Sequence, residues 1–162
     1  MHRRSFRIQR LTFGYRVVRV LWEICWIFLY RPTPNVLHGW RRLLLRLFGA
    51  SIGRGAHPYP SATVWAPWNL VMGERSCLGP FVDCYCVDKI ELGDDSIVSQ
   101  YSYLCSATHD YRDPAFPLVT SPIKIGAKAW IAADVFVGPG VTIGDRAVVG
   151  ARSSVYSDIP PA

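Results

Sequence analysis

The sequence predicts a mainly β protein: a parallel β-helix built from six-residue units and preceded by an N-terminal helical segment. Three observations lead to this fold class. An aliphatic residue returns at every sixth position in the C-terminal part, a small residue follows most of these positions, and residues 1–48 differ in composition from the rest. A period of six fits a short strand plus a corner, repeated around a solenoid, and does not fit the 3.6-residue turn of an α-helix.

The composition is that of one folded domain with a basic extension. The chain has 162 residues, of which half are hydrophobic and 13% aromatic, so disorder is excluded. Residues 1–48 hold ten Arg and one Glu, a net charge of +9, whereas residues 49–162 hold eight basic and eleven acidic residues, a net charge of −3. The arginines alternate with apolar residues, which favours a membrane surface or a protein groove over nucleic acid.

Residues 17–30 are apolar except for Arg19 and Glu23. This run of 14 residues is shorter than the roughly 20 that a membrane-spanning helix needs. It lacks the small-residue cleavage site of a signal peptide, and Arg31-Pro32 ends it. Two interpretations stay open: a segment that lies in a membrane interface, and a helix that packs on the protein itself.

Residues 36–48 have helical spacing, with Asn35 as the expected N-cap and Gly49 as the stop. Their apolar positions form one stripe, and Arg41, Arg42 and Arg46 fall on other faces. A basic amphipathic helix can lie on anionic lipid. Alternatively, the apolar stripe caps the open end of the following domain. These two interpretations can coexist.

The repeat itself is clearest from position 125 onward. Aliphatic residues return six times in succession, at Ile125, Ile131, Val137, Ile143, Val149 and Val155. The first five are followed by Gly126, Ala132, Gly138, Gly144 and Gly150, small residues that we expect to let the backbone turn a corner. The same register occurs earlier, at Leu92, Val98 and Leu104.

With three hexads per coil, the sequence predicts which residues stack inside the solenoid. The three predicted stacks are Leu92 on Ile125 on Ile143, Val98 on Ile131 on Val149, and Leu104 on Val137 on Val155. The interval from Leu104 to Ile125 exceeds six, so a loop at about 110–124 must be extruded. Pro114, Pro117 and Pro122 fit such a loop. The domain is therefore expected to cover residues 49–162.

The five cysteines form an odd set without framework spacing, namely Cys25, Cys77, Cys84, Cys86 and Cys105. Reduced thiols in the cytoplasm fit this set best. No His-Cys cluster completes a zinc site, so no metal is expected. Cys105 lies four residues before His109 and could act as a nucleophile, but its place in the repeat favours packing.

Several motifs occur in order after the repeat begins: Thr108-His109-Asp110-Tyr111, the Pro-rich loop, Trp130-Ile131, GPGVTIG at 138–144, and Asp158-Ile159-Pro160-Pro161. Together they resemble the galactoside, maltose and nodulation-type O-acetyltransferases of the hexapeptide-repeat family. Residues 38–50 and the run WAPWNL at 65–70 are similar, more narrowly, to the colanic acid biosynthesis acetyltransferases. The resemblance covers nearly the whole chain. It implies a left-handed β-helix, a homotrimer, and acetyl-CoA as co-substrate.

The resemblance implies that His109 is the catalytic base. A hydroxyl acceptor must lose its proton as it attacks a thioester, and an imidazole that titrates near neutrality suits this step. Outside the repeat context, the same residue would be interpreted as a solvated loop histidine. No Ser-His-Asp arrangement is visible, so direct transfer is expected. The adjacent Asp110 is one candidate partner for the ring.

Other site residues also follow from the resemblance. Trp130, Ala133, Ala151, Tyr156 and Ser157 fall where the family contacts its CoA, and Asp83 and Asp88 fall where it contacts the acceptor. The alternative for Trp130 is a ring packed on the loop or on a neighbouring subunit.

We expect O-acetyl transfer to a sugar hydroxyl, in exopolysaccharide or capsule biosynthesis, on a sugar or a lipid-linked saccharide. The protein is expected in the cytoplasm, with peripheral contact of residues 1–48 at the inner membrane as a hypothesis. The alternative function is a non-enzymatic, membrane-associated trimeric scaffold. A γ-type carbonic anhydrase would need three metal-binding histidines, and only His109 lies at a suitable corner.

Overall fold

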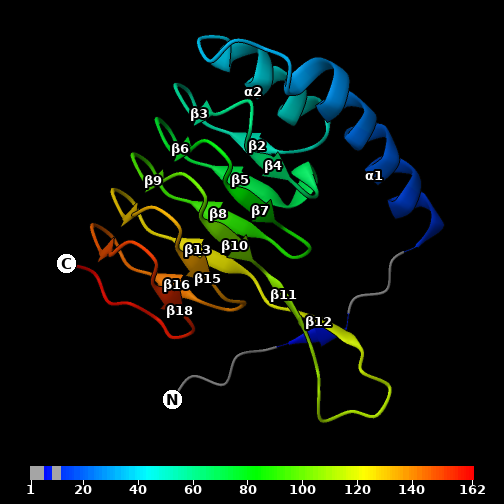
Figure 1. The fold of residues 1–162 in the computed structure, drawn as a ribbon, viewed down its shortest axis with the longest axis vertical. Coiled ribbons are helices and arrows are strands. Elements are labelled where there is room, and N and C mark those ends of the chain that lie inside the picture. Colours follow the sequence, from blue (N-terminus) through cyan, green and yellow to red (C-terminus); the bar gives the residue numbers. More distant parts are fainter. Residues whose placement is uncertain (1–5, 9–11) are drawn as a thin grey trace.

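The chain folds as a parallel β-solenoid of five coils, and each coil contributes one strand to each of three sheets (Figure 1). The computed structural model describes residues 6–8 and 12–162. The first sheet contains β2 (Ser51–Ile52), β5 (Leu70–Met72), β8 (Ile90–Leu92), β13 (Ile123–Ile125) and β16 (Thr142–Ile143). The second contains β3 (His57–Pro58), β6 (Cys77–Leu78), β9 (Ile97–Val98), β14 (Trp130–Ile131) and β17 (Val148–Val149). The third contains β4 (Thr63–Val64), β7 (Asp83–Tyr85), β10 (Tyr103–Cys105), β15 (Phe136–Val137) and β18 (Ser154–Val155).

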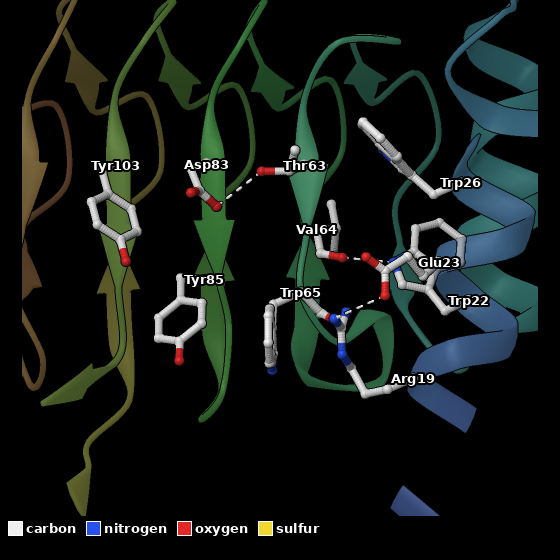
Figure 2. Close-up of a pocket in the computed structure, with 10 residues that line it drawn as sticks. All are labelled: Arg19, Trp22, Glu23, Trp26, Thr63, Val64, Trp65, Asp83, Tyr85 and Tyr103. Atoms are coloured by element: carbon white, nitrogen blue, oxygen red, sulfur yellow. Dashed lines mark hydrogen bonds and ion pairs between the residues drawn. The ribbon is translucent and has the colours of Figure 1, made fainter. Parts of the chain in front are cut away.

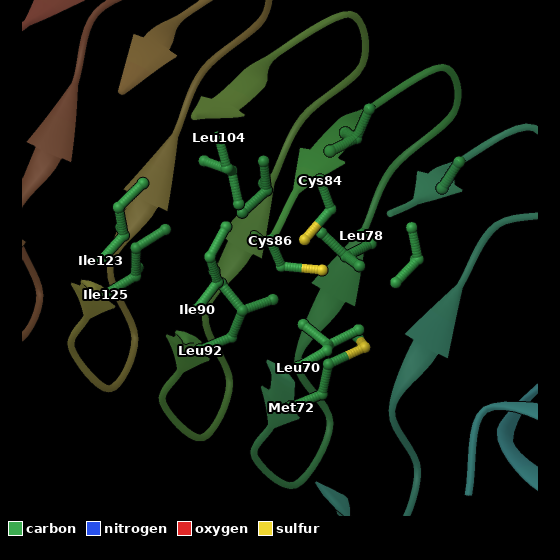
Figure 3. Packing of buried hydrophobic residues seen from close by; sticks show 14 of the residues in the cluster. Leu70, Met72, Leu78, Cys84, Cys86, Ile90, Leu92, Leu104, Ile123 and Ile125 are labelled. Carbon is green, nitrogen blue, oxygen red and sulfur yellow. The ribbon is translucent and has the colours of Figure 1, made fainter. Parts of the chain in front are cut away.

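The strand register confirms all three predicted stacks. Ile125 pairs with Leu92 and Ile143 in the first sheet, Ile131 pairs with Val98 and Val149 in the second, and Val137 pairs with Leu104 and Val155 in the third. All nine side chains are buried. Figure 3 shows the same packing in the earlier coils, where Met72 and Leu92 lie on adjacent strands. The interior is therefore a column of aliphatic layers, which is the main source of hydrophobic stabilisation.

The small residue after each aliphatic position has a different role from the one predicted. A Cβ atom added to Gly126 would lie 2.5 Å from the backbone nitrogen of Asp145 in the next coil. Glycine is therefore required at this position because the next coil leaves no room for a side chain. The left-handed backbone that turns the corner lies two residues later, at non-glycine positions such as Asp95 (φ 57°) and Lys128 (φ 58°).

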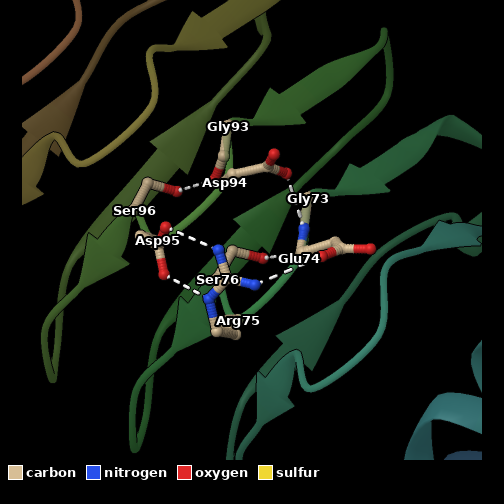
Figure 4. Close-up of polar contacts among 8 residues, drawn as sticks. All are labelled: Gly73, Glu74, Arg75, Ser76, Gly93, Asp94, Asp95 and Ser96. Carbon is tan, nitrogen blue, oxygen red and sulfur yellow. Dashed lines mark hydrogen bonds and ion pairs between the residues drawn. The ribbon is translucent and has the colours of Figure 1, made fainter.

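Polar contacts join consecutive coils at the corner between the first and second sheets (Figure 4). Arg75 pairs with Asp95 of the next coil at 2.6 Å, and the Glu74 N–H donates to Asp94 Oδ1 at 2.7 Å. Ser76 Oγ donates to the Gly73 carbonyl at 2.8 Å within the corner. The Glu74 contact gives a backbone N–H its partner, and the Arg75–Asp95 ion pair joins side chains of consecutive coils.

One long arm leaves the solenoid between β10 and β13. It is an antiparallel ladder of β11 (Ala107–His109) and β12 (Leu118–Thr120), and the short strand β1 (Arg7–Ile8) pairs with β12 on its outer side. The predicted loop at about 110–124 is therefore displaced. The arm begins before residue 110, and residues 123 and 124 already belong to β13, because Ile123 pairs with Ile90.

Two helices cover the N-terminal coil. Helix α1 (Phe13–Cys25) continues into the π-helical turn η1 (Trp26–Tyr30), and α2 (His38–Leu47) follows; a short 3₁₀ turn, η2 (Pro67–Asn69), lies between β4 and β5. The expected cap of α2 at Asn35 was wrong: the helix starts at His38, and its N-cap is Leu37. The Asn35 carbonyl instead accepts a hydrogen bond from Arg41 Nη2. No helix of the described residues has both the length and the apolar character to cross a bilayer.

The basic residues of α2 cap the solenoid. Arg41 donates to the Pro58 carbonyl at 2.7 Å, Arg42 to Ala56 at 2.8 Å, and Arg46 to Ile52 at 2.6 Å. Helix α1 and η1 cap the third sheet similarly, through donors on Arg19 and Trp22 of α1 and on Trp26 of η1. These carbonyls belong to the first coil, which has no preceding strands to pair with.

This arrangement changes the expected role of the apolar stripe of α2. Leu44 and Leu45 are buried beneath the helix, whereas Leu37, Leu43 and Leu47 remain exposed. The helix caps the domain as one interpretation expected, but it does so largely through its arginines. Many of its apolar side chains face outward.

Substitution of Gly126 tests the spacing of the coils. Gly126→Ala should lower the free energy of unfolding by roughly 1–3 kcal/mol, because the new Cβ overlaps the backbone of the next coil. Gly150→Ala is the matched control, since its Cβ would meet nothing closer than 3.9 Å. Chemical denaturation measures both variants; equal losses for the two would contradict the close-approach argument.

Candidate active site

The arm carries His109 at the end of β11, where its side chain is exposed. The Nδ1 atom lies 3.0 Å from the carbonyl oxygen of Phe116. A carbonyl only accepts, so Nδ1 must hold the proton in the neutral ring, and Nε2 keeps its lone pair. The Phe116 ring stacks on the imidazole at 4.4 Å with an angle of 5° between the planes. The arm thus fixes both the tautomer and the orientation of His109.

The two aspartates of the arm tip hold the turn and do not contact the imidazole. Asp110 Oδ1 accepts the Arg112 N–H at 3.0 Å, and Asp113 Oδ1 accepts the Ala115 N–H at 2.9 Å. The Phe116 N–H donates to the Asp113 carbonyl at 2.8 Å. Sequence reasoning left open whether Asp110 orients the ring; a backbone carbonyl has this role instead, and no sequence pattern identifies it.

Asp88 lies beside the base of the arm. Its backbone N–H donates to Ser106 Oγ at 2.9 Å, and Ser106 Oγ in turn donates to the Tyr85 carbonyl at 2.9 Å. One carboxylate oxygen, Oδ1, accepts the Lys89 N–H, whereas Oδ2 is buried and has no hydrogen-bond partner among the described residues. A buried acceptor without a donor is energetically unfavourable.

Asp83 lines a cavity of about 370 Å³ between α1 and the third sheet, which we call the helix–sheet pocket (Figure 2). Thr63 Oγ1 donates to Asp83 Oδ1 at 2.9 Å. The pocket is rich in aromatic rings and has three charged groups; its lining is Arg19, Trp22, Glu23, Trp26, Thr63, Val64, Trp65, Asp83, Tyr85 and Tyr103. Arg19 lies over the Trp65 ring, 3.6 Å from its centroid. Apolar walls with a few polar groups are typical of ligand pockets.

Sequence reasoning identified only Asp83 among these pocket residues. Trp65, Tyr85 and Tyr103 lie at outward-facing positions of the third sheet, where the six-residue period places no constraint on residue type. Their rings follow one another along the sheet, with centroids 5.0 Å and 6.3 Å apart. The sequence pattern that could have revealed this row of rings is an aromatic residue beside the inward-facing residue of the third sheet in three successive coils.

The residues expected at the CoA lie around another corner of the solenoid. Ala133 and Ala151 occupy equivalent positions of consecutive coils between the second and third sheets, and the Arg152 N–H donates to the Ala133 carbonyl. Trp130, on the second sheet, is 48% exposed, and its Nε1 donates to Ser99 Oγ at 3.0 Å. Tyr156 and Ser157 follow β18 and are exposed. The helix–sheet pocket therefore brings Asp83 together with neither His109 nor the residues expected at the CoA.

The cysteines are packing residues in this structure. All five are free thiols, and four of them are buried. Cys105 Sγ donates to the Ala107 carbonyl at 3.1 Å, and burial raises the pKa of the Cys77 thiol to about 11. Within residues 6–8 and 12–162, no three His, Cys, Asp or Glu side chains are grouped so that they could hold a metal ion.

Comparison with known proteins gives consistent matches. The family model "Bacterial transferase hexapeptide (six repeats)" matches residues 122–156. The chain is 46% identical to the protein named "Putative colanic acid biosynthesis acetyltransferase WcaF" of Escherichia coli K12 over 157 residues, which is 96% of this chain and 86% of the relative. It is 58% identical to the galactoside O-acetyltransferase of the same organism over 128 residues, covering 75% of this chain and 61% of the relative.

A solved structure shares the fold. The hexapeptide-repeat acetyltransferase VCA0836 of Vibrio cholerae, complexed with acetyl-CoA, superimposes with a TM-score of 0.81 at 24% identity, covering 93% of this chain and 82% of that one. This confirms the predicted parallel β-helix.

The geometry of the arm predicts the tautomer of His109. In the neutral ring the proton should reside on Nδ1, because that nitrogen faces the Phe116 carbonyl. Nitrogen-15 correlation spectra of the imidazole measure this directly, with His109→Gln to assign the signals. A neutral ring protonated mainly on Nε2 would contradict the arrangement.

Proposed function

The chain belongs to the bacterial hexapeptide-repeat acetyltransferases, and from this premise we propose that it transfers an acetyl group from acetyl-CoA to a sugar hydroxyl. The observation that carries the proposal is the state of His109. Its ring is exposed on the arm, with Nδ1 held by a carbonyl and Nε2 without a hydrogen-bond partner among the described residues. An imidazole fixed in this way is suited to accept a proton from an incoming hydroxyl.

In the proposed reaction, Nε2 of His109 takes the hydroxyl proton as the sugar oxygen bonds to the carbonyl carbon of the thioester. The carbon–sulfur bond then breaks, and His109 returns the proton to the leaving sulfur. The products are the acetyl ester and the free thiol of CoA, and the imidazole is neutral again. Burial of Cys105, at the start of the arm, argues against an acetylated cysteine intermediate.

We assign the donor to the corner that carries Ala133 and Ala151, with Trp130, Tyr156 and Ser157 beside it. Small side chains leave the backbone accessible there, which suits a pantetheine arm. The acetyl-CoA complex of the Vibrio cholerae relative supports the choice of donor.

We assign the acceptor to the helix–sheet pocket. Its aromatic rings suit the apolar faces of a pyranose, and Asp83 can accept hydrogen bonds from sugar hydroxyls. Asp88 does not line this pocket and its Oδ2 atom is buried, so we assign it no contact with the sugar there. The names of the two E. coli relatives refer to colanic acid biosynthesis and to galactosides, which supports a saccharide acceptor in exopolysaccharide biosynthesis.

We further propose a homotrimer in which one subunit's arm brings His109 to the pocket and the donor corner of its neighbours. The support is geometric: the arm projects away from its own solenoid (Figure 1), and His109 is not among the residues that line the pocket. Sedimentation that gives a monomer at assay concentrations would contradict this arrangement.

Substitution of His109 tests the function. His109→Ala should reduce kcat by about 10²–10⁴-fold, because general-base catalysis is lost while binding groups remain. Thiol release from acetyl-CoA, in the presence of nucleotide sugars and oligosaccharide repeat units, measures the rate, and mass spectrometry identifies the acetylated acceptor. His57→Ala is the matched control, since His57 is also an exposed histidine but lies in β3 on the second sheet. Equal activity of both variants would refute the role of His109.

The two binding assignments predict separate effects on KM. Trp130→Ala should raise the KM for acetyl-CoA by about tenfold and leave the acceptor KM nearly unchanged. Asp83→Asn should do the reverse, because it removes a charged acceptor of hydrogen bonds from the pocket. Steady-state kinetics with each substrate varied in turn measures both; the opposite pattern would contradict the assignments.

A further inference from the structure

Helix α1 and its continuation η1 have two opposite stripes. One stripe, formed by Tyr15, Arg19, Trp22 and Trp26, contacts the first coil: Trp22 Nε1 donates to the Val64 carbonyl at 2.6 Å and Trp26 Nε1 to the Ala62 carbonyl at 3.0 Å. The other stripe faces away from the solenoid. We call it the apolar helix face, and it consists of Phe13, Val17, Val20, Leu21, Ile24, Ile27 and Phe28.

The apolar helix face is exposed along its whole length. Its side chains recur at helical spacing and are 42–83% exposed, with Phe28 at 69% and Leu21 at 53%. Beside η1, Trp40 of α2 donates its indole N–H to the Leu29 carbonyl and is itself 41% exposed. Scattered apolar side chains are normal on protein surfaces, but a continuous stripe of this length indicates a binding surface.

The charge around this face favours one occupant. Residues 1–48 carry ten arginines and one glutamate. Four of these arginines bind carbonyls of the first coil, namely Arg19, Arg41, Arg42 and Arg46, so others must supply the charge beside the face. Arg16 lines an apolar groove together with Phe13, Val17, Val20 and Leu21, and Arg31 is exposed at the end of η1. Pairing of this face with the same face of a second copy would bring the exposed cations Arg16 and Arg31 of two chains together, whereas an anionic lipid surface neutralises them.

We propose that the apolar helix face docks on an anionic bilayer surface, with α1 lying in the plane of the interface. The apolar side chains enter the boundary between headgroups and acyl chains, and the flanking arginines contact lipid phosphates. Helix α2 lies at the end of the molecule far from the arm, whereas α1 runs along the side of the solenoid and begins at Phe13, five residues after β1, which pairs with the arm strand β12 (Figure 1).

Docking would also bring the helix–sheet pocket near the membrane, because Arg19, Trp22, Glu23 and Trp26 of the same helical segment line it. Resting on the proposed function, this favours an acceptor saccharide carried on a lipid. The docking itself does not depend on catalysis, and its test uses neither donor nor acceptor.

Vesicle co-sedimentation of the full chain tests the proposal. The protein should bind phosphatidylglycerol vesicles, bind phosphatidylcholine vesicles much more weakly, and lose affinity as salt is raised. The double variant Leu21→Gln/Ile24→Gln should bind the anionic vesicles about tenfold more weakly, because two inserted side chains become polar. Removal of residues 1–48 is unsuitable, since it would uncover the carbonyls that the helices cap.

Ile97→Gln/Val148→Gln is the matched control, because these two residues of the second sheet are 45% and 60% exposed, close to Leu21 and Ile24 at 53% and 51%. It should bind vesicles as the unmodified protein does. Circular dichroism and sedimentation check the fold and assembly of each variant. The proposal is overturned if the unmodified protein does not bind anionic vesicles, or if both double variants bind equally well. The face would be assigned to a second copy of the chain if two results were found together. The unmodified protein would not bind vesicles, and Leu21→Gln/Ile24→Gln, but not the control variant, would form a smaller oligomer.

Discussion

The close approach of consecutive coils is the constraint on which the rest of this structure depends. At Gly73, Gly93 and Gly126, an added Cβ would lie 2.5 Å from an atom of the next coil. The coils can stack this tightly only because a residue without a side chain recurs there. Tight stacking sets the register of all three sheets, and the register fixes which side chains point inward and which form the outer surfaces. The donor corner and the helix–sheet pocket are both consequences of that register.

A rigid solenoid also explains why the proposed chemistry is placed on an arm. The strands of each coil are two or three residues long, and their side chains either fill the interior or lie on a flat outer face. A ladder that leaves the coil can project an imidazole beyond this surface while Ser106, at its base, remains bonded to the preceding coil. The Phe116 carbonyl then orients the ring from within the arm.

The interior could be predicted from the sequence and much of the exterior could not. The stacks of Leu92, Val98 and Leu104 followed from periodicity, because inward positions tolerate only aliphatic residues of similar size. His109 could be singled out because it adjoins the break in the repeat. The sequence did not predict that the arginines of α2 contact the solenoid, because charged residues of an amphipathic helix usually face solvent. In the structure they bind carbonyls of the first coil, which has no preceding strands to pair with. The pocket was missed because it joins α1 to strands about 40 residues away along the chain, and the repeat does not encode that contact.

The caps on the first coil have one more consequence. A parallel solenoid that ends in unpaired strands can template a second solenoid, and repeated addition would produce fibrils. Here the carbonyls of Ile52, Ala56 and Pro58 already accept hydrogen bonds from guanidinium groups. An incoming strand would have to displace three charged side chains before it could pair. The arginines that hold α2 in place therefore also disfavour end-to-end polymerisation at this end of the molecule.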